Sequence, residues 1–347
     1  MFMRNAWYVA AWSAEVKRSL FARVVCGEPI VLFRKQDGTV AALSDRCPHR
    51  FAPLHRGSLL DNDVIQCAYH GLEYGTSGQC VRNPNGNGVV PKAAVLRKYP
   101  VVERYSLVWL WWGAPEEVDE ALIPNFGCLV DPQYRTVGGV IQMAAHYELI
   151  ADNLMDLSHV GFLHAGILGS EAIPRGKHRV RQDGNTVHSN RWCPDGIAPP
   201  AWGAMFDNYT KPVDHWLDMR WNAPAHMLLD VGITPTGRPR SEGIAAWGTD
   251  ILTPESDTST HYFWAISRNW ALGDPNVDET WRKAIDIAFG HQDKPMIEAV
   301  QQMMGSSAFE ELAPVLLDVD AGAMLPRRLL TPFIAEEQKE LANASEH

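Results

Sequence analysis

Two short segments, each with one cysteine and one histidine, place the strongest constraint on how this chain can fold. The first is Cys47-Pro48-His49 and the second is Cys67-Ala68-Tyr69-His70. Four such side chains on two loops can hold tetrahedral zinc, or a two-iron cluster in which the cysteines bind one iron and the histidines bind the other. Zinc loops usually repeat cysteine within one loop, whereas here each loop supplies one ligand of each kind. The pattern therefore favours a [2Fe–2S] cluster, with structural zinc as the alternative.

The size and composition of the chain fit a globular protein with two domains. Its 347 residues are many for one compact core, and 46% of them are hydrophobic while 21% are charged. The net charge of −10 argues against a basic surface for nucleic acid. Six cysteines are too few for a disulfide scaffold of this length, so we expect free thiols or metal ligands.

The sequence predicts neither export nor membrane insertion. The N-terminal segment lacks a basic stretch followed by a long apolar run, which argues against a signal peptide. No apolar stretch approaches the roughly 18 residues that are needed to span a bilayer. We therefore expect a cytoplasmic protein without membrane contact.

The N-terminal third of the chain has the pattern of short β-strands separated by turns. Strand-like runs occur at residues 23–35, 39–45, 63–74, 79–83 and 106–113. Turn signals rich in glycine, asparagine, aspartate and serine separate these runs. A small antiparallel β domain is expected, followed by an acidic, proline-containing linker at 114–127.

Beyond the linker the pattern changes to a mixture of helices and strands. Residues 148–164, 277–304 and 325–342 are predicted to be helical. Strand-like runs lie between the first two helical segments, at 187–193, 213–221, 226–234, 243–252 and 260–268. An antiparallel sheet covered by helices, of the α+β class, is the simplest arrangement.

A pair of histidines, His159 and His164, lies in the first of these helical segments. On a continuous helix this spacing would point the two side chains about 140° apart, so they could not meet at one metal. They can converge only if the helix ends or distorts between them, which Gly161 permits. By itself the pair fits a metal site and two partly buried polar histidines equally well.

Together these motifs resemble those of the Rieske non-haem iron oxygenases. The cysteine–histidine segments look like the ligand boxes of a Rieske [2Fe–2S] domain, and D-x-x-H-x4-H, ending at His164, looks like the mononuclear iron motif of the family. The resemblance implies that His159 and His164 bind Fe(II) and that Asn153 lines the iron site. It also implies that Asp156 is an electron-transfer bridge, hydrogen-bonded to the cluster histidine of a neighbouring subunit, here His70. Asp156 and His159 are three positions apart and are expected to be neighbours on one helical face, so the same carboxylate can orient His159.

The third iron ligand comes from a distant segment in this family. AFGHQDKPMIEAVQQ resembles the helix that supplies the carboxylate, and the match places that carboxylate at Asp293. Asp286 and Glu298 are the alternatives if the register is shifted, and a surface charge beside Lys294 is the other interpretation of Asp293. Two histidines and one carboxylate bind Fe(II) on one face and leave other positions open for oxygen.

Most of the chain resembles one group within the family, the vanillate O-demethylase and dicamba monooxygenase-like enzymes. RNAWYVAAW, CPHRFAPL, DNLMDLSH and ILTPESDTSTHYFWAISRNW carry this likeness. It implies a Rieske domain over residues 1–115, a catalytic domain over residues 116–347, and a head-to-tail homotrimer. It further implies a partner reductase with flavin and iron–sulfur centres, which passes electrons from NAD(P)H.

The reaction that the resemblance implies is O-demethylation of a methoxylated aromatic acid of the vanillate type. With O2, the methoxy carbon is hydroxylated, and the product breaks down to a phenol and formaldehyde. The alternatives within the family are hydroxylation of an aryl methyl group and N-demethylation. Two alternatives belong to other classes: a Rieske electron carrier without oxygenase activity, and a zinc-stabilised binding protein.

Polar and aromatic residues of the predicted strands are candidates for the substrate pocket. They are Arg220, His226, Trp247, Asp250 and Trp264. Arg220 is suited to a bidentate grip on a carboxylate. Dicamba monooxygenase-like sequences carry a histidine where Asp250 precedes ILTPE, which counts against a carboxylate grip of that type. The other cysteines have no ligand spacing and receive no function; they are Cys26, Cys80, Cys128 and Cys193.

Overall fold

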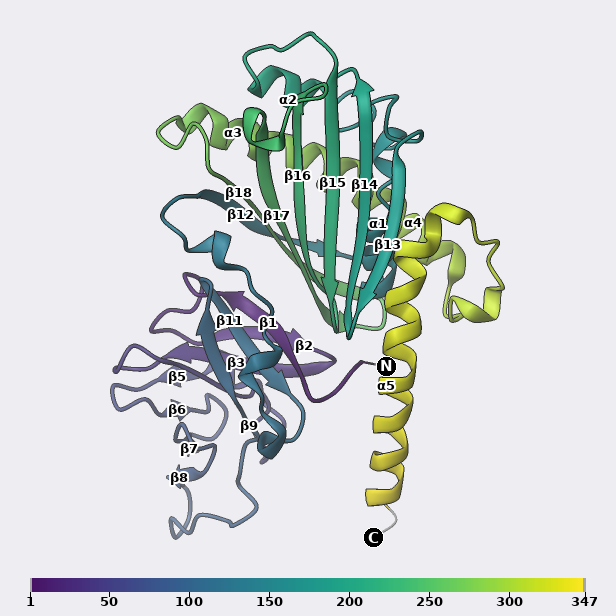
Figure 1. The fold of residues 1–347 in the computed structure, drawn as a ribbon. Coiled ribbons are helices and arrows are strands. Elements are labelled where there is room, and N and C mark those ends of the chain that lie inside the picture. The colour runs from purple at the N-terminus through teal and green to yellow at the C-terminus, as the bar shows by residue number, and fades with distance from the viewer. Residues whose placement is uncertain (1, 346–347) are drawn as a thin grey trace. The chain divides into compact units, whose positions relative to one another are not determined.

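The computed structural model describes residues 2–345, with side chains through Glu337. The chain folds into two compact units (Figure 1). The smaller unit comprises Phe2–Ile123 together with Thr253–Ser256, and the larger one comprises Pro124–Leu252 and the chain from Asp257 onward. The division falls within the acidic segment 114–127, whose regular structure is limited to short 3-10 turns.

The smaller unit is built from three antiparallel sheets with the strand orders β1-β11-β10, β2-β3-β4-β9 and β5-β6-β7-β8. The strands are β1 (Ala6–Trp12), β2 (Phe21–Val25), β3 (Glu28–Arg34), β4 (Val40–Ser44), β5 (Ser58–Leu59), β6 (Ile65–Gln66), β7 (Glu73–Tyr74), β8 (Cys80–Arg82), β9 (Lys98–Tyr99), β10 (Val101–Arg104) and β11 (Leu107–Trp112). The expected small β domain is confirmed. The run at 63–74 is not one strand, however, because a ligand loop separates β6 from β7.

Strand β3 lies between the two hydrophobic cores of this unit. Ile30 and Leu32 pack into one core, whereas Val31 and Phe33 pack into the other. Successive side chains of a strand point to opposite faces, so a strand that is buried on both faces can be hydrophobic at every position. The second core also contains both cysteines of the paired segments, so the bases of the two ligand loops are held in packed structure.

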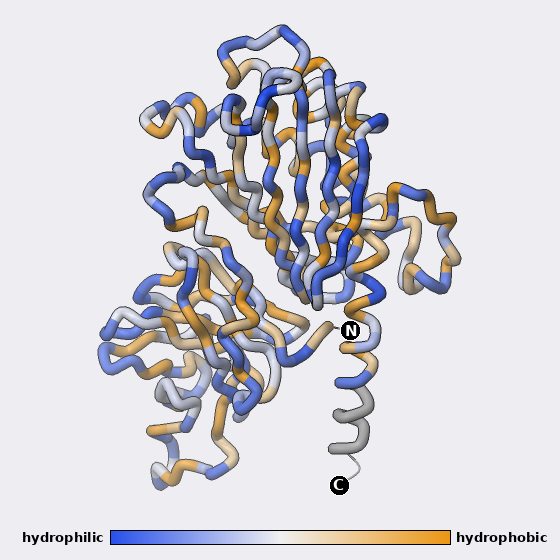
Figure 2. The backbone as a smooth tube through the Cα atoms, in the orientation of Figure 1, coloured by the Kyte–Doolittle hydropathy of each residue, from blue (hydrophilic) through white to orange (hydrophobic). Residues whose placement is uncertain are grey.

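The larger unit is a seven-stranded antiparallel sheet, of order β12-β18-β17-β16-β15-β14-β13, with helices against one face (Figure 1). The strands are β12 (Arg135–Met143), β13 (Lys177–Asp183), β14 (Thr186–Gly196), β15 (Val213–Asn222), β16 (His226–Pro235), β17 (Ile244–Ser256) and β18 (Ser259–Arg268). The α+β class and the five expected strands are confirmed. The sequence does not predict the two edge strands, because β12 is interrupted by Gly138-Gly139 and β13 is largely hydrophilic (Figure 2).

Alternation along the strands decides which side chains face the helices. On β15 the side chains of His215, Leu217 and Met219 line a cavity between the sheet and the helices. The side chains between them therefore point to the opposite face of the sheet.

The helices differ from the predicted ones mainly in where they end. Helix α1 (Tyr147–Met155) stops well before residue 164. The predicted helix at 277–304 is divided into α3 (Pro275–Ile285), a π-helical segment (Asp286–Asp293) and α4 (Lys294–Met304). Pro295 follows the π-helical segment; proline lacks an N–H group and crowds the carbonyl four residues before it, so the wider π turn gives it room.

Two further helices complete the larger unit. They are α2 (Pro200–Met205) and α5 (Ala321–Ser345), and α5 packs against α1 and β14. None of the helices in the described chain is both long enough and apolar enough to cross a membrane.

Candidate metal centres

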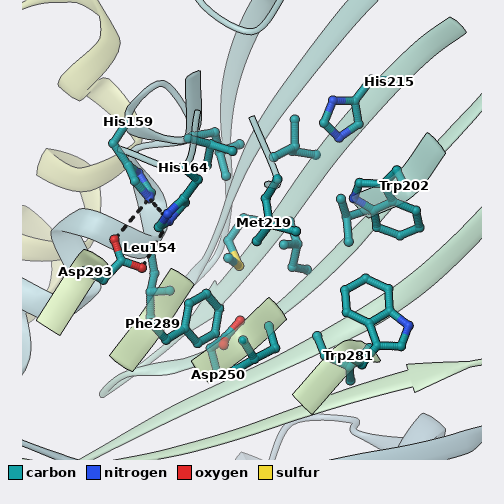
Figure 3. Close-up of a pocket in the computed structure, with 18 residues that line it drawn as sticks. Leu154, His159, His164, Trp202, His215, Met219, Asp250, Trp281, Phe289 and Asp293 are labelled. Atoms are coloured by element: carbon teal, nitrogen blue, oxygen red, sulfur yellow. Dashed lines mark hydrogen bonds and ion pairs between the residues drawn. The ribbon is translucent and has the colours of Figure 1, made fainter. Parts of the chain in front are cut away.

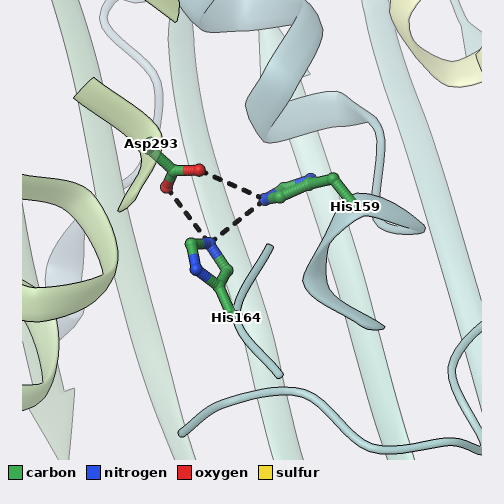
Figure 4. A group of neighbouring side chains, drawn as sticks. All are labelled: His159, His164 and Asp293. Atoms are coloured by element: carbon green, nitrogen blue, oxygen red, sulfur yellow. Dashed lines mark hydrogen bonds and ion pairs between the residues drawn. The ribbon is translucent and has the colours of Figure 1, made fainter. Parts of the chain in front are cut away.

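Three side chains from two distant segments converge in the larger unit (Figure 4). His159 Nε2 lies 3.3 Å from His164 Nε2, and the Asp293 carboxylate lies 3.2 Å from His164 Nε2 and 3.7 Å from His159 Nε2. His164 and Asp293 are buried, and His159 is largely buried. These three residues are called the triad below.

The end of α1 allows the two histidines of the triad to meet. The helix ends at Met155, Asp156 adopts an extended backbone conformation, and His159–Gly161 form a separate 3-10 turn. His164 follows this turn, so the separation of about 140° that a continuous helix would impose does not apply. A side chain at Gly161 would lie 2.9 Å from the Pro174 ring, so glycine is needed there for close packing.

The donor set of the triad fits a divalent metal. His159 Nδ1 contacts the backbone carbonyl of Asp156, and His164 Nδ1 lies 2.8 Å from Gln292 Oε1. Both contacts place the ring proton on Nδ1, so each Nε2 directs a lone pair at the other and at the Asp293 carboxylate. Burial lowers the pKa of His159, which favours its neutral, metal-binding form. Three electron-pair donors converge here, and two imidazoles with one carboxylate suit Fe(II).

Two neighbouring side chains hold the triad in place. Asn153 Nδ2 donates to Asp293 Oδ1 at 3.1 Å, and Gln292 orients His164. Sequence reasoning identified Asn153 but missed Gln292. Gln292 directly precedes Asp293 in the sequence, but this position alone does not show that the Gln292 amide reaches His164.

The Asp156 carboxylate does not orient His159, in contrast to the expectation. Its Oδ1 accepts hydrogen bonds from the Ser158 backbone N–H at 2.8 Å and from the Ser158 hydroxyl at 2.6 Å. The backbone carbonyl of Asp156 contacts the histidine instead. The physical reason is that α1 ends before Asp156, so the two residues do not share a helical face. The two alternatives to Asp293 lie elsewhere: Asp286 is exposed beside His291, and Glu298 accepts from the backbone of Ala144.

A largely apolar cavity of about 80 Å³ adjoins the triad (Figure 3). Leucine, isoleucine, valine, methionine and aromatic side chains from the sheet and the helices form most of its walls. Among the aromatic ones, the Trp202 and Trp281 rings pack edge to face at 5.2 Å. Apart from the triad, its polar lining consists of Asp250 and His215, and sequence reasoning missed His215.

The other pocket candidates lie outside this cavity. Arg220, His226 and Trp247 each lie an odd number of positions from the lining residues of their strands, so alternation directs them to the opposite face of the sheet. Arg220 Nη2 there donates to the Asn125 carbonyl at 2.8 Å. Trp264 shares the cavity face of β18, but its indole lies over Gly139 of β12. A Cβ atom at Gly139 would lie only 3.1 Å from Trp264 Nε1.

The two cysteine–histidine loops in the smaller unit have the same backbone design. In each loop the cysteine carbonyl accepts a hydrogen bond from the backbone N–H four residues later, that of Phe51 in one loop and of Gly71 in the other. The cysteine N–H donates to the carbonyl of the next residue, Ala52 or Leu72. Phe51 and Gly71 both have positive φ, of 58° and 71°. Glycine tolerates this conformation, whereas a phenylalanine rarely adopts it.

The donor atoms of these loops fit a cluster with two thiolates and two imidazoles. Cys47 and Cys67 are buried, and the rings of His49 and His70 lie 4.4 Å apart between centroids. Burial raises the pKa of Cys67, while hydrogen bonds from two backbone N–H groups act in the opposite direction and favour the thiolate.

A tyrosine hydroxyl adds a contact to this group. The hydroxyl oxygen of Tyr74 lies 3.3 Å from Cys47 Sγ, a contact that sequence reasoning missed. The side chain of Tyr69, which lies within the second ligand loop, is mostly exposed.

Comparisons with known proteins agree with both sites. The model of the Rieske [2Fe-2S] domain matches residues 6–100, and that of the vanillate O-demethylase oxygenase C-terminal domain matches residues 143–336. The oxygenase component of dicamba O-demethylase from Stenotrophomonas maltophilia is 41% identical, over 93% of this chain and 95% of its own. The oxygenase component of chloroacetanilide N-alkylformylase from Rhizorhabdus wittichii is 39% identical, over 97% of each.

A solved structure shows the same fold. The crystal structure of dicamba monooxygenase with non-haem iron and dicamba superposes with a TM-score of 0.84 at 39% identity, and covers 99% of both chains. The cofactors of the present chain are one Rieske [2Fe–2S] cluster and one mononuclear iron. The chain belongs to the Rieske non-haem iron oxygenases whose catalytic part is the vanillate O-demethylase oxygenase C-terminal domain.

Proposed function

We propose that this chain is an aromatic O-demethylase that hydroxylates the methoxy carbon of a methoxylated aromatic substrate. As an oxygenase component it works with a separate reductase and acts on a small molecule. The proposed reductase takes electrons from NAD(P)H and passes them through flavin and iron–sulfur centres. Because nicotinamide cofactors are supplied inside the cell, a cytoplasmic location is part of the proposal.

The observation that carries this proposal is the apolar cavity that ends at the triad (Figure 3). Its walls suit an aromatic ring, and the triad provides a place for the reacting carbon. Iron bound there supplies the capacity to activate O2 with electrons from the cluster. The cavity side chains hold the ring so that its methoxy carbon lies at the triad, and they exclude bulk water.

The proposed reaction balances with one O2, two electrons and two protons. One oxygen atom enters the methoxy C–H bond and gives a hemiacetal, ArOCH2OH, while the other leaves as water. The hemiacetal then breaks its aryl-oxygen to methylene bond. Its hydroxyl proton passes to the aryl oxygen, and the products are a phenol and formaldehyde.

We assign ligands to each centre from their geometry. His159, His164 and Asp293 hold the mononuclear iron in the catalytic domain, 116–347. The [2Fe–2S] cluster lies in the Rieske domain, 1–115, and its ligands are Cys47, His49, Cys67 and His70. Substituting Asp293 by alanine should empty the mononuclear site and leave the cluster spectrum intact. Loss of both signals would instead indicate misfolding and would leave Asp293 without support as a ligand.

We further propose a head-to-tail homotrimer in which electrons cross from His70 of one subunit to Asp156 of the next. Both side chains are only partly buried in their own units, which suits groups that meet across a subunit interface. A closed ring lets every subunit act once as donor and once as acceptor.

Product analysis tests the proposed reaction. The holoenzyme is incubated with a generic reductase, NADH and a panel of methoxy-, methyl- and N-methyl-substituted aromatics. The proposal predicts equal amounts of formaldehyde and phenol from a methoxy substrate. Oxidation of an aryl methyl group to an alcohol, without any reaction at methoxy groups, would contradict it.

N-dealkylation is the second candidate function. It is favoured by the relative at 39% identity, the oxygenase component of a chloroacetanilide N-alkylformylase. The same panel separates the two, because N-dealkylation leaves an aniline or amide N–H instead of a phenol. A Rieske carrier or a zinc-stabilised binding protein would release neither product.

A further inference from the structure

His215 is a buried histidine that the fold leaves unpaired. Its side chain is 2% exposed, and neither ring nitrogen has a hydrogen-bond partner among the described residues. Burial lowers the pKa of His215 to about 4, so the neutral imidazole offers one N–H donor and one acceptor at neutral pH. Buried polar groups are nearly always satisfied, so an unpaired one in a cavity wall can take its partner from the cavity.

The position of His215 makes the cavity the natural source of its partner. Its cross-strand neighbours, Cys193 and Ile233, are fully buried and apolar, and they offer no strong hydrogen-bonding group. The imidazole lines the cavity on the side away from the triad (Figure 3). A ring whose methoxy group lies at the triad would therefore present a distal substituent to His215.

Asp250 is the other polar group of the cavity wall. It is 3% exposed, and its Oδ1 accepts a hydrogen bond from the Tyr262 hydroxyl at 2.5 Å. Burial raises the pKa of Asp250 to about 7, and the nearby Asp293 charge acts in the same direction. Whether protonated or ionised, this carboxyl group carries no positive charge.

The described lining of the cavity contains no lysine and no arginine. A substrate carboxylate would enter an apolar space beside a neutral imidazole and an acidic side chain, and an unpaired anion is strongly disfavoured there. The positive charge of bound iron is at the triad, where the reacting carbon must lie. Arg220, the cation that suits a carboxylate best, is on the other face of the sheet.

We propose that the cavity selects uncharged aromatic substrates, and that His215 is a specificity-determining residue that hydrogen-bonds a neutral polar substituent distal to the triad. The inference rests on the proposed O-demethylation, because it places the methoxy group at the triad. It departs from the vanillate-type acid that the family resemblance implies. The expected ligand class is a methoxyarene with an amide, hydroxyl or carbonyl group.

A matched pair of ligands tests the charge selection on the unmodified holoenzyme. Anaerobic calorimetric titration compares 3-methoxybenzamide with 3-methoxybenzoate, which have nearly the same shape and differ in charge. We expect the amide to bind at least about 10-fold more tightly, because the carboxylate loses hydration without gaining a cation. Equal binding, or tighter binding of the benzoate, would overturn the proposal.

A substitution tests the role of His215. His215→Leu should weaken binding of 3-methoxybenzamide by about 10-fold, because one hydrogen bond is lost. Binding of 3-isopropylanisole, which fills similar space without a polar group, should be unchanged or tighter. Met219→Leu, on the same strand face, is the control and should leave the ratio of the two affinities unchanged. If His215→Leu also leaves that ratio unchanged, the assignment of His215 is wrong; if the variant does not fold, the ligand pair still decides the charge selection.

Two outcomes separate the charge selection from the proposed O-demethylation. Tight amide binding without formaldehyde release would contradict O-demethylation and support the charge selection. Formaldehyde release from both ligands, with equal affinities, would support O-demethylation and overturn the charge selection.

Discussion

Arg327 of α5 and Asp152 of α1 form a bidentate ion pair, with Nη2 at 2.7 Å from Oδ2 and Nε at 3.0 Å from Oδ1. Arg327 Nη1 also donates to Glu148 Oε2 at 2.6 Å. The guanidinium is largely buried, and α1 carries Asn153 near its C-terminal end. The pair therefore ties the C-terminal helix to the element that positions the triad.

Removing this arginine should destabilise the larger unit. Arg327→Ala leaves two carboxylates without their cation, and such a loss costs about 3 kcal/mol of unfolding free energy. Chemical denaturation followed by tryptophan fluorescence measures the change. Arg328→Ala, at the exposed neighbouring position, is the control and should have little effect. Equal stability of the two variants would show that the ion pair is not important for the fold.

Gln292 should set the strength of iron binding through His164. Gln292→Leu removes the acceptor for the Nδ1 proton, and loss of such a partner typically lowers metal affinity by about 10- to 100-fold. Competition with a chelator measures the dissociation constant for Fe(II). His291→Ala removes an exposed neighbour and should leave the affinity unchanged. An unchanged affinity in the Gln292 variant would mean that the fold alone orients His164.

Asp156→Asn should slow electron transfer and leave both centres loaded. The amide keeps the oxygen that accepts from Ser158 but carries no charge for the neighbouring cluster histidine. We expect turnover to fall by about 10- to 100-fold or more, while iron and sulfide contents stay at the wild-type level. Ser158→Ala keeps the carboxylate and should retain most of the activity. Full activity in the asparagine variant would remove Asp156 from the electron path.

Asp250 should make the stability of the protein depend on pH. Its pKa is about 7 in the folded protein and near 3.8 in the unfolded chain, so the folded state binds the extra proton between these values. Stability is therefore lost as the pH rises through this window. Asp250→Asn removes the effect and should gain stability relative to wild type from pH 4 to pH 7, by on the order of 4 kcal/mol at most.

The Asp250 measurement requires protein from which the mononuclear iron has been removed, because a nearby divalent cation would lower the pKa of the carboxyl group. Thermal unfolding of wild type and variant between pH 4 and pH 8 gives the difference. Asp183→Asn, on the exposed edge strand, should show no such trend. A constant difference between wild type and the Asp250 variant across this range would mean that Asp250 does not titrate there.

The parts of the molecule that local chemistry determines could be predicted from the sequence. The cysteine–histidine loops are closed by hydrogen bonds within a few residues, so their spacing is visible in the chain. The central strands were predictable because each is a run of β-favouring residues in the sequence. By contrast, the meeting of His159 and His164 depends on where α1 ends, and the chain permits that ending without locating it.

The substrate pocket shows why the remaining positions could not be predicted. Arg220 and Met219 are adjacent on β15, yet only Met219 lines the cavity, because a shift of one residue moves a side chain to the other face. The face that the helices cover is decided by tertiary packing. Sequence reasoning missed His215 as a cavity residue, because nothing in its local sequence shows which face of the sheet the helices cover.

The most direct test of the proposed chemistry is a single turnover under 18O2. The reduced holoenzyme is mixed with 3-methoxybenzamide and labelled oxygen, and the phenol is analysed by mass spectrometry. Hydroxylation of the methoxy carbon keeps the original aryl oxygen, so O-demethylation predicts an unlabelled phenol formed together with formaldehyde. A phenol that carries 18O would show that the enzyme attacks the ring, and would contradict O-demethylation.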